Sequence, residues 1–216
     1  MSTPSPQPAN KTLTDHLRAR TASIIDPIVT FLARIGVSPD LLTILGMLLH
    51  FLFAWLIATG EFGWAGIAIF VFVPLDALDG SLARKIGRQQ GNFGAFLDST
   101  SDRIAEIILY SGYLSYFYQN DEVWMSIATY AAVTGSIMVS YTRSRAEALG
   151  LSCKVGLLTR VERYVVIVAS LLLSVFWSGF VNLGIAVLAI GTWFTVGQRV
   201  YHVWRQTKTI SKTNSE

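Results

Sequence analysis

Residues 41–59 read LLTILGMLLHFLFAWLIAT, an apolar stretch that contains no Asp, Glu, Lys or Arg. A helix that crosses the hydrocarbon core of a bilayer needs about 20 predominantly apolar residues, so this stretch predicts a membrane-spanning helix. The whole chain has the same character, because 52% of its 216 residues are hydrophobic, 14% are charged and the mean hydropathy is +0.47. Soluble domains contain about 25% charged residues. The composition therefore argues against a soluble globular protein.

Five further apolar stretches follow the first. They are residues 62–75, 104–118, 123–141, 164–177 and 181–196. Several are too short for a bilayer, so we expect their helices to continue into polar sequence at one end. With six spans, all 17 Lys and Arg residues fall on the side that holds both termini, and basic residues mark the cytoplasmic side. The sequence predicts an all-α integral membrane protein of the cell (inner) membrane, with six transmembrane helices and both termini in the cytoplasm.

Polar segments precede and follow the six apolar stretches. Residues 1–10 are polar with three prolines, which predicts a disordered tail. Residues 11–37 place apolar side chains at helical spacing among charged ones, which favours an N-terminal amphipathic helix in the membrane interface over an ordinary packing helix. Residues 38–204 then form the six-helix domain, and we expect the polar C-terminal tail, 205–216, to be disordered. A net charge of +3 gives no indication of a nucleic acid partner.

Two short segments carry four aspartates near the ends of the second and third spans. Residues 76–84 read DALDGSLAR and residues 94–102 read GAFLDSTSD. On a helix, residues three or four apart lie on one face, so two neighbouring helices can bring all four carboxylates together. They are Asp76, Asp79, Asp98 and Asp102.

These acids need compensation, because a centrally placed aspartate costs about 2.5 to 3.5 kcal/mol in a membrane. Two Mg²⁺ ions, or Mn²⁺, would supply it, and two-metal sites activate phosphoryl groups. Solvated pairs with nearby basic residues are the alternative.

The spacing resembles the signature of the CDP-alcohol phosphatidyltransferases, D-x2-D-G-x2-A-R followed after eight or nine residues by G-x3-D-x3-D. All eight fixed positions match, with nine residues between Arg84 and Gly94. The resemblance implies transfer of a phosphatidyl group from CDP-diacylglycerol to an alcohol, with release of CMP. It implies that all four aspartates bind metal and that Asp102 is also the general base. The residues implied to contact CDP-diacylglycerol are Pro39, Asp40, Thr43, Gly80 and Arg84.

A second basic cluster bears on the identity of the alcohol. Arginine binds phosphate oxygens bidentately, so arginines at three helix ends on the aspartate side predict a pocket for a phosphorylated acceptor. They are Arg143, Arg145, Arg163 and Arg199. The runs around them resemble the S-Y-x-K-A-R-A-E and E-R stretches of bacterial phosphatidylinositol-phosphate synthases, which favours inositol 1-phosphate. Phosphatidylglycerophosphate synthesis from glycerol 3-phosphate is the alternative within the family.

The residues alone also allow two functions other than an enzyme, a cation transporter and a non-catalytic scaffold. Intramembrane aspartates also occur in cation transporters, and a non-catalytic scaffold would not need them. The resemblance further implies a homodimer, for which small residues such as Gly135 and Ser136 are a slight indication. His50, in the middle of the first span, is expected to bond to a neighbouring helix, whereas Glu106 continues the stripe of Asp98 and Asp102 without a defined role.

Overall fold

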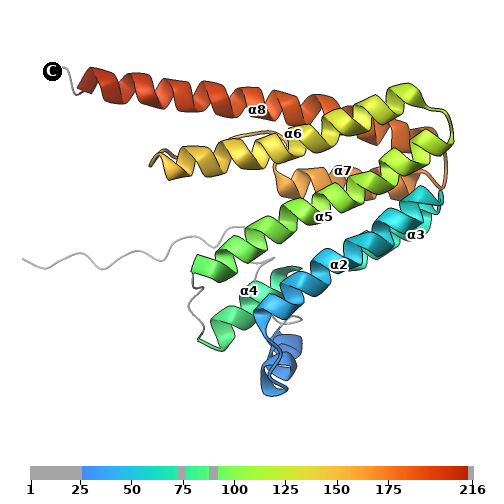
Figure 1. Ribbon diagram of the computed structural model, residues 1–216, viewed down its shortest axis with the longest axis horizontal. Helices are drawn as coiled ribbons and strands as arrows, with labels where there is room; N and C mark the ends of the chain where they lie inside the picture. Colours follow the sequence, from blue (N-terminus) through green and yellow to red (C-terminus); the bar gives the residue numbers. More distant parts are fainter. Residues whose placement is uncertain (1–25, 73–75, 88–91, 214–216) are drawn as a thin grey trace, which may run out of the picture.

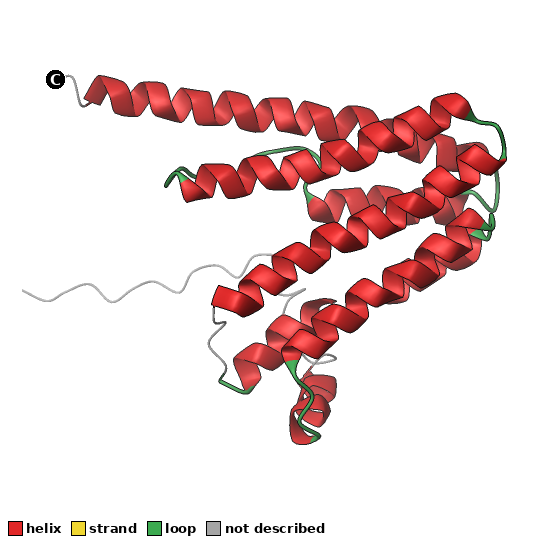
Figure 2. Cartoon of the chain, in the orientation of Figure 1, coloured by secondary structure: helices red, strands yellow, loops and turns green. Residues whose placement is uncertain are grey.

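The computed structural model describes residues 26–72, 76–87 and 92–213, and every regular element within these ranges is a helix (Figure 2). After a first helical segment over residues 26–34, the helices are α2 (Pro39–Ala58), α3 (Phe62–Phe72), α4 (Asp76–Lys85), α5 (Asn92–Gln119), α6 (Val123–Ala148), α7 (Arg160–Leu173) and α8 (Gly179–Thr213). The expected tail over residues 1–10 lies outside the described residues, as does most of the expected interfacial helix. The all-α class is confirmed for the described part of the chain.

The long helices run back and forth, so that successive connections lie at opposite ends of the molecule (Figure 1). Three of them, α2, α6 and α8, are long and apolar enough to cross a bilayer. α5 has 28 residues, but four charged side chains lie within its first 15 residues. α3 and α7 have 11 and 14 residues and are shorter than a bilayer requires. Six spans therefore remain a prediction, whereas three candidate spans are established.

The helices extend into polar sequence, as expected, and α8 extends further than expected. α5 begins at Asn92, well before the apolar stretch that starts at residue 104. The C-terminal tail was expected to be disordered. This expectation is wrong up to Thr213, because α8 continues to that residue. Two contacts stabilise the extension: Gln206 Nε2 donates to the Ser152 carbonyl at 2.6 Å, and Lys208 Nζ lies 3.9 Å from the centre of the Trp204 ring.

The amino-terminal part of the described chain fixes α4. Val29, on the segment over residues 26–34, is buried against Leu78 and Leu82 of α4. Lys85 Nζ, at the end of α4, lies 2.9 Å from Asp26 Oδ1. These contacts hold the helix that carries the first aspartate pair next to the start of α2.

Helices α2 and α5 lie side by side and approach each other closely at Gly112 (Figure 1). A Cβ atom at Gly112 would lie 2.4 Å from the Ala54 carbonyl oxygen, so only glycine permits this distance between the helices. Small residues also allow α6 to approach its neighbours closely. Gly135 faces Thr192 of α8, and Ser136 is fully buried beside Tyr110 of α5. Gly135 and Ser136 thus make contacts inside the chain and do not indicate a dimer.

The close approach of α2 and α5 can be tested with Gly112→Ala. The added methyl group must push the helices apart, and overpacking of this kind costs about 1 to 3 kcal/mol of stability. We expect a lower melting temperature of the purified protein in detergent. Gly197→Ala is the matched control, because a Cβ atom there meets nothing within 4 Å. Equal melting temperatures of the two variants would contradict the proposed packing.

Candidate functional site

A hydrogen bond joins the first turn of α2 to the middle of α4. Thr43 Oγ1 donates to Asp79 Oδ2 at 2.6 Å, and the other carboxylate oxygen of Asp79 accepts from the Gly80 amide at 2.5 Å. Ser38 caps the start of α2 by accepting from the Leu41 amide, which fixes the turn that presents Thr43. The two segments that the sequence assigns to CDP-diacylglycerol therefore lie in contact.

The other residues of that set lie around this junction. Pro39 is buried in the first turn of α2, and Asp40 beside it lies 3.9 Å from the position of a Cβ atom at Gly94, the start of α5. Arg84, on the exposed side of α4, donates to Ser81 Oγ at 3.0 Å. The starts of α2 and α5 and the length of α4 thus form one polar region.

A small, partly open cavity lies between α2, α4, α5 and α7. One face of α2 supplies four lining residues at helical spacing, and three aspartates line it from α4 and α5. The lining residues are Thr43, Gly46, Met47, His50, Asp79, Asp98, Ser101, Asp102, Ala105 and Arg160. Asp76 begins α4, but its side chain lies outside the described part of the structure.

Asp79, Asp98 and Asp102 face the same cavity, and two of them are engaged with protein groups. Asp79 is bonded to Thr43, and Asp102 Oδ2 lies 2.6 Å from Arg160 Nη1. Among the described side chains, no three acidic, His or Cys residues lie close enough together to hold a metal ion. The chemistry of the donor set nevertheless fits a hard divalent cation, because Asp79, Asp98 and Asp102 offer only carboxylate oxygens to the cavity.

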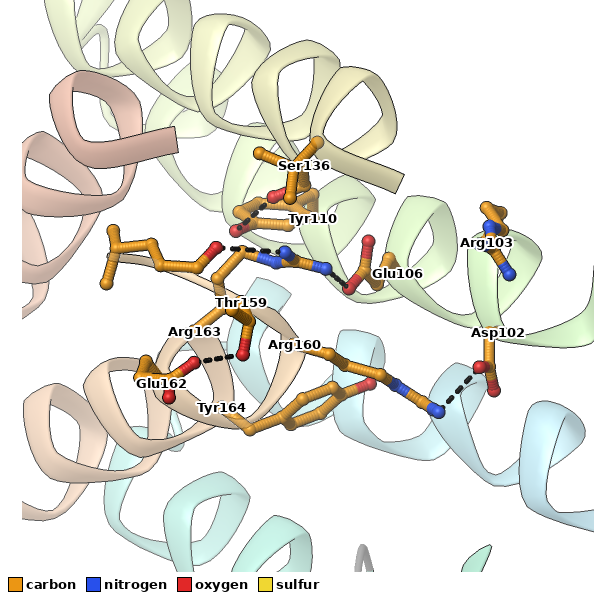
Figure 3. Close-up of polar contacts among 12 residues, drawn as sticks. Asp102, Arg103, Glu106, Tyr110, Ser136, Thr159, Arg160, Glu162, Arg163 and Tyr164 are labelled. Atoms are coloured by element: carbon orange, nitrogen blue, oxygen red, sulfur yellow. Dashed lines mark hydrogen bonds and ion pairs between the residues drawn. The ribbon is translucent and has the colours of Figure 1, made fainter. Parts of the chain in front are cut away.

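Arg160 is the cavity residue that the sequence patterns did not single out. It is the first residue of α7 and pairs with Asp102 of α5, while its guanidinium carbon lies 5.8 Å from the centre of the Tyr164 ring (Figure 3). The signal was present in the sequence, because Arg160 stands three residues before Arg163 and must share its helix face.

A second ion pair lies one helical turn deeper, between Glu106 and Arg163 (Figure 3). Both side chains are almost fully buried, at 6% and 2% exposed. Arg163 Nη2 donates to Glu106 Oε1, and Arg163 Nη1 donates to the Leu158 carbonyl at 3.3 Å. Glu106 and Asp102 are four residues apart on α5, and their partners are three apart on α7, so the two pairs join matching faces. Glu106 thereby acquires the role that the sequence left undefined.

The predicted acceptor arginines differ in their surroundings. Arg199 is buried, and its guanidinium donates to the carbonyl oxygens of Val155 and Val139. Arg143 is exposed and pairs with Glu147 at 2.8 Å, and Arg145 is exposed one turn from the end of α6. Arg199 nevertheless lies near both Arg143 and Arg163. The three arginines form a cluster in which Arg143 and Arg163 each have an acidic partner.

The connection between α6 and α7 is fastened to α8 along its length. The Leu158 amide donates to Thr195 Oγ1 at 3.0 Å, and the Leu157 amide donates to Gln198 Oε1 at 3.1 Å. Cys153, in this connection, is fully buried, and burial raises the pKa of its thiol above the ordinary value. Cys153 is therefore a neutral, packed side chain.

Comparison with known proteins identifies the family to which this chain belongs. The sequence model of the CDP-alcohol phosphatidyltransferase family matches residues 36–197, and the chain belongs to this family of enzymes. A phosphatidylinositol phosphate synthase from Streptomyces avermitilis is 35% identical, with 90% of this chain and 83% of the relative covered.

Two crystal structures of Mycobacterium tuberculosis phosphatidylinositol phosphate synthase have the same fold. The structure with CDP-DAG bound has a TM-score of 0.80 and 33% identity, covering 85% of this chain and 94% of that one. The structure in complex with manganese and citrate has a TM-score of 0.78 and 33% identity, covering 83% and 88%.

The buried ion pair can be tested with Glu106→Gln. The amide keeps the size of the side chain but leaves the Arg163 charge buried without a counter-charge, which costs about 3 to 5 kcal/mol. We expect a marked loss of thermal stability. Glu147→Gln is the control, because the exposed pair with Arg143 is worth about 1 kcal/mol at most. Losses of similar size in the two variants would show that Arg163 does not depend on Glu106.

The reactivity of Cys153 tests whether the α6–α7 connection is packed against α8. We expect a maleimide to label Cys153 slowly in the folded protein and rapidly after denaturation, because the thiol is buried. Arg199→Gln removes the bonds to Val155 and Val139 and should accelerate labelling in the folded protein. Rapid labelling of the unmodified protein would contradict the described packing.

Proposed function

We propose that this chain is a membrane enzyme that transfers a phosphatidyl group from CDP-diacylglycerol to inositol 1-phosphate, giving phosphatidylinositol phosphate and CMP. The observation that carries the proposal is the cavity itself, which Asp79, Asp98 and Asp102 line together with Arg160. Its membership of the CDP-alcohol phosphatidyltransferase family supports the reaction type. The names of its relatives support the acceptor.

Divalent metal belongs to this proposal, and a relative has been crystallised with manganese. We assign Asp76, Asp79, Asp98 and Asp102 as the residues that would hold two Mg²⁺ ions, with Mn²⁺ as a substitute. When bound, such ions neutralise phosphoryl oxygens and the leaving group.

Other residues of the chain bind the CDP group and accept the proton of the attacking hydroxyl. Pro39, Asp40 and Thr43 at the start of α2 bind the CDP group with Gly80 and Arg84 of α4. Asp102 accepts the proton of the attacking hydroxyl, which requires it to leave Arg160 when substrate is present. Arg160 is then available to the acceptor.

The arginine cluster supports a phosphorylated acceptor. Arg199 lies near Arg143 and Arg163, and a phosphate that reached these side chains would accept hydrogen bonds from their guanidinium groups. Arg145 adds charge at the end of α6, and Arg160 connects this cluster to the aspartates. In this proposal the arginines give affinity for the phosphate, whereas Asp102 acts on the hydroxyl.

The proposal includes the membrane arrangement. Six helices of a domain over residues 38–204 cross the cell (inner) membrane, with an interfacial helix over residues 11–37 and both termini in the cytoplasm. The distribution of all 17 basic residues on one side supports this orientation. The cavity would then open to the cytoplasm, from which the acceptor comes, and laterally to lipid. A homodimer is part of the proposal by analogy with the family.

The reaction is tested with purified protein, CDP-diacylglycerol and Mg²⁺, by measuring CMP release with each acceptor separately. We expect release with inositol 1-phosphate and none after chelation of the metal. Release with glycerol 3-phosphate alone would overturn the acceptor assignment. Cation flux in liposomes without CMP release under any condition would favour a transporter instead.

The role of Asp102 is tested with Asp102→Asn. The amide keeps the shape but cannot accept the proton, and loss of a general base lowers kcat by about 10²-fold to 10⁴-fold. Asp121→Asn, at the far end of the α5–α6 hairpin, is the matched control. Asp121 has a φ of 58°, which asparagine also adopts readily. Unchanged kcat in Asp102→Asn would remove Asp102 from the reaction.

A further inference from the structure

A buried histidine lies at the inner end of the cavity, and the proposed mechanism does not use it. His50 is 2% exposed, lines the cavity from α2 and bonds to Tyr164 of α7. We propose that His50 and Tyr164 are positioning residues that hold the Arg160 guanidinium in the cavity, where it binds the phosphate of the acceptor. This inference rests on the proposed function and deepens it.

The hydrogen bonds of His50 fix the direction of the contact. Its Nδ1 lies 2.9 Å from the Gly46 carbonyl oxygen, which can only accept, so Nδ1 carries the proton. In the neutral ring Nε2 is then the acceptor. It receives the Tyr164 hydroxyl proton over 2.9 Å. The bond between α2 and α7 therefore has one defined donor and one defined acceptor.

Tyr164, held by His50, in turn restrains the position of Arg160. The two residues are four apart on α7 and share a face, and the Arg160 guanidinium carbon lies 5.8 Å from the centre of the Tyr164 ring, within the range of a cation–π contact. Figure 3 shows the Tyr164 ring beside the Arg160 side chain, which reaches past it to Asp102. With its hydroxyl bonded to His50, the ring cannot turn away from this position.

Arg160 consequently has two restraints of different kinds. Its terminal nitrogen is held by Asp102 at 2.6 Å, a contact that the proposed reaction must release. Its guanidinium group lies over the Tyr164 ring, a contact that can persist when a phosphate replaces the carboxylate. Without the Tyr164 platform, a long arginine side chain that leaves Asp102 would spread over many rotamers, and acceptor affinity would fall.

The conservative test is Tyr164→Phe, which removes the hydroxyl and keeps the ring. We expect the KM for the phosphorylated acceptor to rise roughly fivefold, the size of one hydrogen bond, while kcat and the KM for CDP-diacylglycerol change less than twofold. His50→Leu should give the same split. The double variant should be no worse than either single one, because both remove the same bond.

Tyr110→Phe is the matched control. The Tyr110 hydroxyl is also buried and also bonds across a helix contact, to Ser136 Oγ at 3.3 Å, but it does not line the cavity. We expect it to change thermal stability alone. If Tyr164→Phe behaves like Tyr110→Phe, or if the effects of His50→Leu and Tyr164→Phe on acceptor KM add up, His50 and Tyr164 have only a structural role and the inference fails.

A binding measurement separates this inference from the proposed reaction. Thermal stabilisation of the protein by inositol 1-phosphate, without CDP-diacylglycerol, reports acceptor affinity without turnover. A weaker affinity of Tyr164→Phe than of the unmodified protein supports the positioning role, even if the unmodified protein releases no CMP and the proposed reaction fails. Equal affinities overturn it, even if the reaction is confirmed. No stabilisation by any phosphorylated alcohol would overturn the positioning role, whereas the proposed reaction is decided by CMP release.

Discussion

The arrangement of the site depends on the pairing of acidic residues on α5 with basic residues on α7. An uncompensated charge among apolar helices is costly, so Asp102 and Glu106 require partners, and Arg160 and Arg163 supply them. The two pairs differ in exposure, since the outer pair lies in the cavity and the inner pair is buried. The inner pair therefore fixes the relative position of α5 and α7, and the outer pair is the one that a substrate can exchange.

The same division gives one cavity a wall that attracts cations and a wall that attracts anions. Carboxylates on α4 and α5 form one wall, and the arginine of α7 forms another. Like charges on each wall repel, and opposite charges between the walls attract. Ligands that match each wall replace contacts that the protein otherwise makes with itself, such as the bond between Arg160 and Asp102.

Much of this could be predicted from the sequence, because it depends on local spacing. The three-residue and four-residue intervals between aspartates placed Asp98 and Asp102 on one face of α5, next to the α4 segment that carries Asp79. The expected interhelical bond of His50 is also confirmed. The partners of His50 and Glu106 could not be predicted, because Tyr164 and Arg163 are distant in sequence and come close only when α7 takes its place in the bundle, where it packs mainly against α3 and α8. The helical extension of α8 was missed for the same reason, since its stabilising contact comes from the α6–α7 connection.

In the proposed six-span arrangement, the shortness of α7 has a consequence for the surrounding lipid. Its 14 residues cover about 21 Å, whereas the hydrocarbon core of a bilayer is about 30 Å thick. A bilayer adapts to a short helix by thinning beside it, which lowers the level of the headgroups locally. Arg160, the part-exposed arginine in the first turn of α7, would then meet water and lipid phosphates without leaving the helix.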